Sequence, residues 1–452
     1  MYPLFLGVAQ WLAGVPVAET LSNSAAGVVR DLQCVLGLLA ACFVYLTLRT
    51  LGVRKNVALV AGLFFSTLVG TCASEMAIVT PSLSVFSVTL AAWLYAKAVI
   101  RVGAEKLPAG LAVGAGLAVS LAALTRPDNL VFFTVIILAT AGFAVRSRFV
   151  PARAALGRRL LATCGVACIS AAPLLLAWMT CNYIGTGRFR MTNMMGVQMT
   201  QTVYNMYDQV DAEDQVLGSI MNKYYAATNQ HGVNREYVWP AMGELTARAW
   251  QMPFLDARDD QRSKLGNWVY NLASDKSRRQ MDHYSVAFSD YLARVAWRLI
   301  RKNPAGYLHN AVDSFARDSF DFVPKLPSPK EVSDPRAVEG GSVVKNETGW
   351  NLICWTGIVQ APILTLFYVV ALACVFSSPL ILLNRNEGTR VSDVAVVAMG
   401  MGTVATFVAF CLLEAYHNQY GTPYLSTLTI CGAYVFDNFG RMGGALGLRK
   451  VL

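Results

Sequence analysis

The sequence predicts an all-α polytopic membrane protein with about nine or ten transmembrane helices and one large, mainly helical external domain. The 452-residue chain is 55% hydrophobic and only 15% charged, whereas about 25% of the residues in a typical soluble domain are charged. Apolar runs of membrane-spanning length recur along it and are separated by short loops that carry Arg and Lys. One long polar block interrupts them. These observations exclude a soluble enzyme.

Nine apolar runs are long enough to cross a bilayer. They cover residues 32–48, 56–73, 82–99, 108–124, 129–145, 160–181, 353–383, 391–413 and 423–438. A further apolar run at residues 1–17 is either a tenth span or a helix at the outer interface. The runs divide the chain into an N-terminal transmembrane region (1–181), an external domain (182–350) and a C-terminal transmembrane region (351–452).

Basic residues predict how the spans are oriented. Five clusters of Arg and Lys fall in alternate loops, and such an excess is typical of the cytoplasmic side. The clusters are Arg49, Arg54 and Lys55; Lys97, Arg101 and Lys106; Arg146, Arg148, Arg153, Arg158 and Arg159; Arg385 and Arg390; and Arg441, Arg449 and Lys450. We therefore expect a multi-pass protein of the inner (plasma) membrane whose block 182–350 is external, or periplasmic.

The net charge of +10 also comes from the basic residues of the membrane regions. The block 182–350 carries 20 basic and 19 acidic residues, so the basic excess lies in the membrane regions and nucleic acid is not an expected partner. None of the ten cysteines falls between residues 182 and 353, which excludes a disulfide framework and a thiolate metal site there. The sequence also contains no phosphate loop, zinc-spacing motif or nucleophile elbow.

Within the external block, two stretches have the apolar spacing of amphipathic helices. They cover residues 290–300 and 304–320. The pair Asn303-Pro304 is a favourable combination for starting the second helix, because Asn caps a helix well and Pro fits its first turn. We therefore expect this block to fold.

Polar residues gather at the predicted external ends of the spans. Placing a charged side chain in lipid costs at least about 2.5 kcal/mol, so such a residue pairs with another group or has a function. The candidates for binding or catalysis are Glu75, Arg126, Asp128, Arg188, His417 and Tyr420. Together they offer carboxylates, guanidinium groups and one imidazole at a single membrane face, a set suited to phosphate binding and proton transfer.

Each candidate also has a simpler interpretation. Asp128 can cap a helix that begins at Leu130, while Arg126 anchors the turn at the membrane interface. Glu75 and His417 can be solvated loop residues. The sequence alone leaves both interpretations open.

Several short motifs occur in a recognisable order. They are Tyr2-Pro-Leu-Phe-Leu6, Tyr45-Leu-Thr-Leu-Arg49, Ser74-Glu75, Leu124-Thr-Arg-Pro-Asp128, Asn182-Tyr183, Gly187-Arg-Phe189, Lys302-Asn-Pro304 and the stretch from His417 to Pro423. In this order the chain resembles, from end to end, the GT-C membrane glycosyltransferases, in particular the bacterial branch similar to protein O-mannosyltransferases and lipid A aminoarabinose transferases. Relative to that family, we expect the chain to lack the first helix and first external loop.

The resemblance implies an enzyme, a polyprenyl-phosphate-sugar-dependent glycosyltransferase. Such an enzyme transfers a sugar from a lipid-linked donor to a glycan, lipid or protein acceptor at the external membrane face. The resemblance assigns carrier-phosphate binding to Arg126, Arg188, His417 and Tyr420, and acceptor activation or metal coordination to Glu75 and Asp128. It assigns no metal ligand with certainty, and a divalent metal is compatible with the chemistry but not required. The alternatives are a lipid or solute transporter, an inactive scaffold of the same fold, and a lipid-linked glycan polymerase or ligase.

Overall fold

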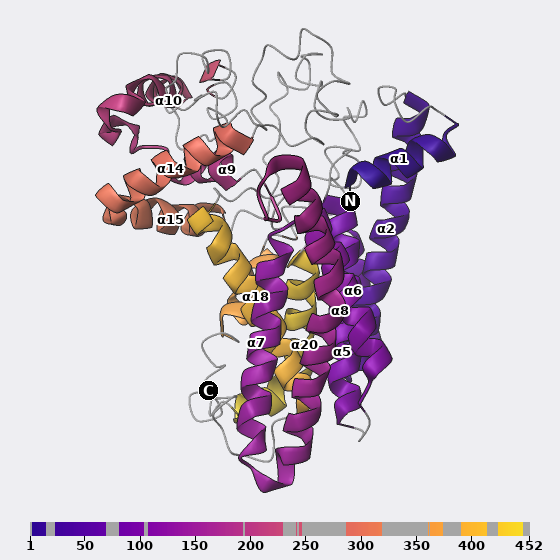
Figure 1. Cartoon of the computed structure of the whole chain (residues 1–452). Helices are drawn as coiled ribbons and strands as arrows, with labels where there is room; N and C mark the ends of the chain where they lie inside the picture. Colours follow the sequence, from indigo (N-terminus) through magenta and orange to yellow (C-terminus); the bar gives the residue numbers. More distant parts are fainter. Residues whose placement is uncertain are drawn as a thin grey trace. The chain divides into compact units, whose positions relative to one another are not determined.

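The computed structural model describes most of the membrane regions and part of the block between them. The described residues are 2–14, 23–68, 81–103, 107–192, 195–228, 241, 244–245, 286–318, 360, 362–373, 390–413 and 424–445. They form helices joined by turns, and no strand occurs among them (Figure 1). The prediction of an all-α polytopic membrane protein is confirmed.

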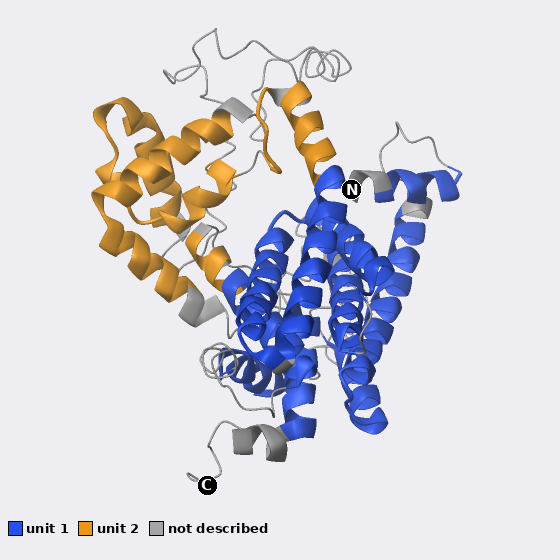
Figure 2. Ribbon diagram, turned by 60° about the horizontal axis from the view of Figure 1, so that its bottom comes forward, with its two compact units in different colours: residues 1–174, 318–406, 417–452 blue, residues 175–317, 407–416 orange. Residues whose placement is uncertain are grey.

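The chain divides into two compact units. Unit 1 comprises residues 1–174, 318–406 and 417–452, and unit 2 comprises residues 175–317 and 407–416 (Figure 2). Two helices, α8 (Ala154–Thr186) and α18 (Val391–Leu413), contribute residues to both units. Unit 2 therefore continues directly from helices that begin in unit 1.

Unit 1 is a bundle of apolar helices. Besides the first parts of α8 and α18 it contains α1 (Tyr2–Leu12), α2 (Asn23–Thr50), α3 (Lys55–Ser66), α5 (Pro81–Val102), α6 (Ala109–Thr125), α7 (Asn129–Arg148) and α20 (Leu425–Ala445). Within the described residues, five helices are long and apolar enough to cross a membrane, namely α2, α5, α7, α8 and α18. The apolar helices α3, α6 and Pro362–Ala373 are shorter. Each of the nine predicted runs contains one of the described helices.

Small residues allow these helices to approach each other closely. A Cβ at Gly116 of α6 would lie 2.1 Å from Ser170 Oγ and 2.2 Å from the Ala167 carbonyl oxygen of α8. The neighbouring Ser120 hydroxyl donates a 2.9 Å hydrogen bond to the Ala171 carbonyl oxygen. Backbone contact at glycine and hydroxyl bonds between helices are typical of packing inside a membrane, where apolar side chains gain little by leaving lipid.

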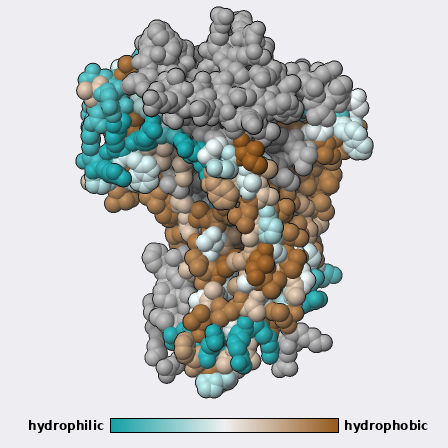
Figure 3. All heavy atoms as spheres, viewed as in Figure 1, coloured by the Kyte–Doolittle hydropathy of each residue, from teal (hydrophilic) through white to brown (hydrophobic). Residues whose placement is uncertain are grey.

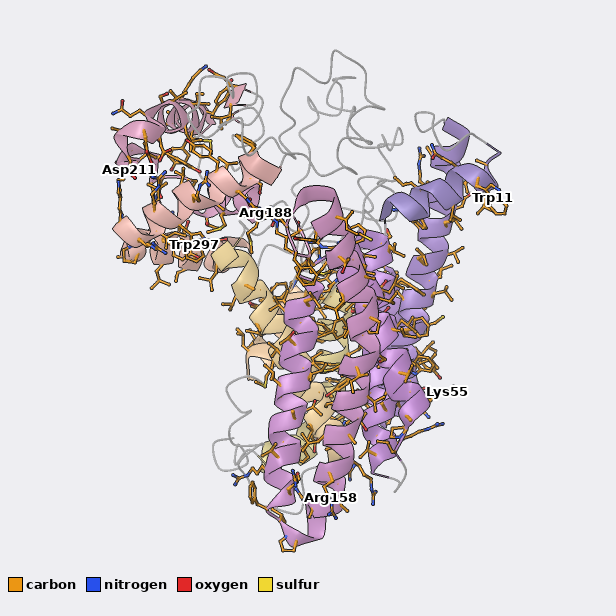
Figure 4. All side chains as sticks on the ribbon, viewed as in Figure 1. Trp11, Lys55, Arg158, Arg188, Asp211 and Trp297 are labelled. Carbon is orange, nitrogen blue, oxygen red and sulfur yellow. The ribbon has the colours of Figure 1, made fainter. Side chains whose placement is uncertain are left out.

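Basic residues from several predicted cytoplasmic loops of unit 1 lie at one end of its bundle. At this end Arg54 pairs with Asp437 in the second half of α20, and the Arg159 guanidinium donates a 3.3 Å hydrogen bond to the Val102 carbonyl oxygen at the end of α5. Figure 4 shows Lys55 and Arg158 at this end and Trp11 toward the other. Figure 3 shows hydrophilic side chains at the basic end and mainly hydrophobic side chains above it. If basic loops alternate along the chain, their basic residues must lie at one common end of the bundle.

Helix α1 lies in the first apolar run, which the sequence leaves as either a tenth span or a helix at the outer interface. Its 11 described residues extend about 16 Å, which is about half of the ~30 Å hydrocarbon core of a bilayer. Trp11 near its end is largely exposed, as is common for an aromatic side chain at a membrane interface. The described part of this run thus has the length of an interfacial helix.

Unit 2 has an apolar core of its own. Its helices α9 (Met195–Thr202), α10 (Gln215–Thr228), α14 (Val286–Lys302) and α15 (Pro304–Asp318) bury side chains that include Tyr207, Met221, Phe288, Leu292 and Leu299. The two amphipathic helices predicted at 290–300 and 304–320 are confirmed as α14 and α15.

The start of α15 is also as predicted. The Gly306 amide donates a 2.8 Å hydrogen bond to the Asn303 side-chain oxygen, which is the bond that a helix-capping residue makes. Pro304 occupies the first helical position. A polar side chain and a proline therefore set the boundary between α14 and α15.

Candidate functional site

The turn between α6 and α7 carries two of the predicted site residues, Arg126 and Asp128. Helix α6 ends at Thr125, and Arg126 has an extended backbone with φ −148° and ψ 117°. Pro127 explains this conformation, because a proline pushes the residue before it out of the helical region. Helix α7 then begins at Asn129. The turn therefore holds Arg126 and Asp128 close together at one end of the bundle.

Arg126 and Asp128 form an ion pair. The Arg126 Nε lies 3.1 Å from the Asp128 Oδ1. Only 8% of the Arg126 side chain is exposed, against 20% of the Asp128 side chain. A buried guanidinium requires such a partner. The carboxylate is the more accessible member of the pair.

The capping interpretation of Asp128 is wrong. Asp128 directly precedes α7, which begins at Asn129 and not at Leu130, and its side chain makes no capping hydrogen bond. Its backbone is helical, with φ −60° and ψ −28°, whereas a capping residue usually has an extended backbone. The carboxylate points instead to Arg126 and to Tyr424.

Tyr424 connects this turn to the C-terminal part of the chain. Its hydroxyl lies 3.1 Å from the Asp128 Oδ2 and 2.7 Å from the Asn129 Oδ1. The residue is fully buried, and its ring packs against Phe132 of α7 with 5.3 Å between the ring centroids. Both carboxylate oxygens of Asp128 therefore have a partner within the bundle.

Asn129 joins the cluster to two more helices. Its Nδ2 donates hydrogen bonds to Ser84 Oγ of α5 at 2.9 Å and to the Ala122 carbonyl oxygen of α6 at 2.8 Å. The cluster of Ser84, Arg126, Asp128, Asn129 and Tyr424 thus lies where α5, α7 and α20 begin and α6 ends. Helix N-termini carry a partial positive charge that favours an anion. Together with Arg126, they make this end of the bundle suitable for a phosphate group.

The sequence analysis did not select Ser84, Asn129 or Tyr424. Each lies at the edge of a predicted apolar span, and a polar residue in such a place is itself a weak signal of function or packing. Of the residues that were selected, Glu75, His417 and Tyr420 lie outside the described residues.

Arg188 belongs to unit 2, where Asp290 of α14 binds it. The Arg188 Nε lies 3.0 Å from one Asp290 oxygen, and an Arg190 terminal nitrogen lies 2.6 Å from the other. The Asn182 Nδ2 donates a 2.7 Å hydrogen bond to the Arg190 carbonyl oxygen. The Arg188 side chain is still about half exposed, so a solute can reach it.

Unit 2 also contains a group of three carboxylates. Ligand oxygens of Asp211, Glu213 and Asp214 lie within 4.8 Å of one another. Arg298 of α14 forms ion pairs with all three, and its hydrogen bond to Glu213 is the main cause that raises the pKa of its guanidinium. Basic side chains thus neutralise the group, and the arrangement resembles a structural ion-pair network more than a cation site.

Residues 1–155 match a protein-family model described as dolichyl-phosphate-mannose-protein mannosyltransferase. Over these residues the expected resemblance to GT-C glycosyltransferases is confirmed. The matched part of the chain includes the helices from α1 to α7 and the turn that holds Arg126 and Asp128.

Among solved structures, the chain is similar to an archaeal oligosaccharyltransferase, AglB from Archaeoglobus fulgidus, in complex with an inhibitory peptide and a dolichol-phosphate. The TM-score is 0.46 and the sequence identity 15%. The match covers 100% of this chain and 43% of the AglB chain, so this chain spans less than half of the AglB length. No curated protein sequence matches significantly.

Proposed function

We propose that this protein is an integral-membrane glycosyltransferase that transfers a sugar from a polyprenyl-phosphate-linked donor to an acceptor at the external membrane face. The observation that carries the proposal is the pairing of buried Arg126 with more exposed Asp128 at one end of the bundle. The pair lies at the start of α7, whereas Arg146 and Arg148 lie at its end, about 30 Å away along a helix of this length. The site and the basic loops therefore occupy opposite ends.

In the proposed reaction Arg126 stabilises the phosphate that leaves. The bond between the sugar C1 and the phosphate oxygen breaks, and its electron pair stays on the phosphate, which remains attached to the polyprenyl carrier. A guanidinium and three helix N-termini placed where this negative charge develops lower the barrier. A carrier that enters from the lipid also explains why the sequence needs no nucleotide-binding motif.

Asp128 is the proposed base. It takes the proton from an acceptor hydroxyl while the hydroxyl oxygen bonds to the sugar C1. In the resting protein Arg126 pairs with Asp128 and holds the carboxylate at the site. Both Asp128 oxygens have partners, Arg126 and Tyr424, so the described residues do not favour Asp128 as a metal ligand.

The other residues that the sequence selected keep supporting roles in the proposal. Arg188, His417 and Tyr420 are further proposed ligands of the carrier phosphate, and Glu75 is a second proposed acidic group. The acceptor is a glycan, lipid or protein. The proposed location is the inner membrane, with the long loop on the external side.

The test measures transfer from a series of undecaprenyl-phosphate-linked sugars by the purified chain, with extracted cell-envelope material as the source of acceptors. Replacing Asp128 by Asn should lower the rate about 30- to 1000-fold, equivalent to roughly 2–4 kcal/mol of transition-state stabilisation. Arg54→Ala is the matched control, because Arg54 also pairs with an aspartate but at the basic end. Parent-rate transfer by a folded Asp128→Asn variant would place the base elsewhere.

A further inference from the structure

Tyr424 lies on the buried side of the Asp128 carboxylate. Asp128 is partly exposed, whereas Tyr424 is fully buried. The Tyr424 hydroxyl is therefore in a position to act on the carboxylate but not on a substrate outside it. Its position is fixed at the ring by Phe132 and at the hydroxyl by Asn129.

The orientation of the Asn129 amide follows from its partners. The Ala122 carbonyl oxygen can only accept a hydrogen bond, so the Asn129 nitrogen must face it. The Asn129 oxygen then faces the Tyr424 hydroxyl at 2.7 Å, and this oxygen too can only accept. Tyr424 must therefore donate to satisfy Asn129.

The Tyr424 hydroxyl has one hydrogen. The Thr406 hydroxyl also makes a hydrogen bond with it, and two oxygens that can only accept, those of Asn129 and of ionised Asp128, lie next to it. The Asn129 oxygen at 2.7 Å is nearer than the Asp128 Oδ2 at 3.1 Å. While Asp128 is ionised, both oxygens compete for this hydrogen. Once Asp128 holds a proton on Oδ2, that proton has an acceptor in the Tyr424 oxygen, and the Tyr424 hydrogen goes to Asn129. The hydrogen bonds from Asp128 to Tyr424 and from Tyr424 to Asn129 then form without competition.

We propose that Tyr424 is a positioning residue for glycosyl transfer: it orients the Asp128 carboxylate and accepts a hydrogen bond from it once Asp128 has taken the acceptor proton. The inference rests on the proposed function. It explains why a buried tyrosine and a buried asparagine are placed behind an accessible carboxylate. The acceptor O–H bond breaks, the proton moves to Asp128, and Tyr424 neither gains nor loses a proton overall.

The test compares the wild-type chain with Tyr424→Phe, Asp128→Asn and the double variant in the same transfer assay. Tyr424→Phe should lower kcat about 10- to 100-fold, because displacing a catalytic base by about 1 Å lowers the reaction rate by about this factor. The KM for the polyprenyl-phosphate sugar should change less than about twofold, because Tyr424 does not touch the phosphate. In the Asp128→Asn background the Tyr424→Phe change should have little further effect.

Tyr434→Phe is the matched control. Tyr434 lies on α20, the helix that begins directly after Tyr424, and is as deeply buried. Its hydroxyl lies 2.7 Å from Asp393 Oδ1 and 2.9 Å from Ser392 Oγ. Ser392 and Asp393 lie at the start of α18, next to the basic end of the bundle. Tyr424→Phe and Tyr434→Phe should lower the unfolding temperature similarly, but only Tyr424→Phe should lower kcat.

Equal kcat for the two tyrosine variants, with Asp128→Asn inactive, would overturn the inference and leave the proposed function standing. An additive loss in the double variant would also overturn it. Absence of transfer by the wild-type chain from every donor would overturn both. If Tyr424→Phe does not fold, 3,5-difluorotyrosine at position 424 keeps the ring and hydroxyl but weakens the oxygen as an acceptor, and it should still lower kcat.

Discussion

At the scale of single residues, the geometry of Arg126 predicts how well another cation can replace it. Its guanidinium is buried and bonds Asp128 through Nε, and in the proposed mechanism the guanidinium also binds the carrier phosphate. Arg126→Ala should lower the transfer rate about 30- to 1000-fold. Arg126→Lys should restore only part of that loss, because Lys offers a point charge in place of a planar fork. Full activity of the Lys variant would show that charge alone suffices.

A second residue-scale prediction concerns pH and the ion-pair network of unit 2. The hydrogen bond from Lys302 lowers the pKa of Asp211 below its ordinary value of 3.8. A group whose folded pKa is lowered stabilises the fold above its unfolded pKa, and this contribution is lost as the pH falls through the folded pKa. Lys302→Ala should therefore reduce stability at neutral pH, and the difference from the wild type should shrink below about pH 4.

The measurement for Lys302 is thermal unfolding of the full chain from pH 7 to pH 3. Arg301→Ala is the control, because Arg301 is the neighbouring exposed basic residue on the same helix. This change removes a positive charge but keeps the hydrogen bond from Lys302 to Asp211, so its effect on the unfolding temperature should be smaller. A Lys302→Ala difference that stayed constant with pH would show that the contact with Asp211 does not stabilise unit 2.

At the scale of elements, helix α6 offers a matched pair of glycines. A Cβ at Gly116 would come within 2.2 Å of the α8 backbone, whereas a Cβ at Gly110 would meet nothing within 4 Å. Gly116→Ala should destabilise unit 1 by about 1–3 kcal/mol through overpacking. Gly110→Ala should be neutral or slightly stabilising, since Ala favours a helix by about 1 kcal/mol over Gly. Thermal unfolding of both variants in the same detergent measures the difference, and equal unfolding temperatures would mean that α6 and α8 separate readily.

At the scale of the whole molecule, the basic residues predict a topology. Reporter fusions at Ala154, within the Arg-rich α7–α8 connection, and at position 230 should report opposite sides of the membrane, with Ala154 cytoplasmic. The grouping of Arg54, Arg159, the end of α5 and the second half of α20 at one end of unit 1 supports this arrangement. The same compartment for both fusions would contradict the nine-span topology.

Much of this architecture is predictable because a bilayer imposes strong local rules. A span must be a long apolar helix whose backbone is satisfied internally, so apolar runs identify α2, α5, α7, α8 and α18. Basic loops must alternate with other loops, which predicts the basic end. The start of α15 is also determined by adjacent residues, because Asn303 caps this helix and Pro304 occupies its first position. Such features depend only on neighbouring residues.

The sequence by itself therefore determined the all-α membrane fold and the positions of the described helices. Tertiary structure alone decided what Asp128 does. Residue type and position suggested a helix cap, but the carboxylate faces Arg126 and, across 296 residues of chain, Tyr424. That choice depends on α20 packing beside α7, where Phe132 and Asn129 hold the tyrosine. Side-chain partners of this kind arise from packing between distant helices, which no local pattern encodes.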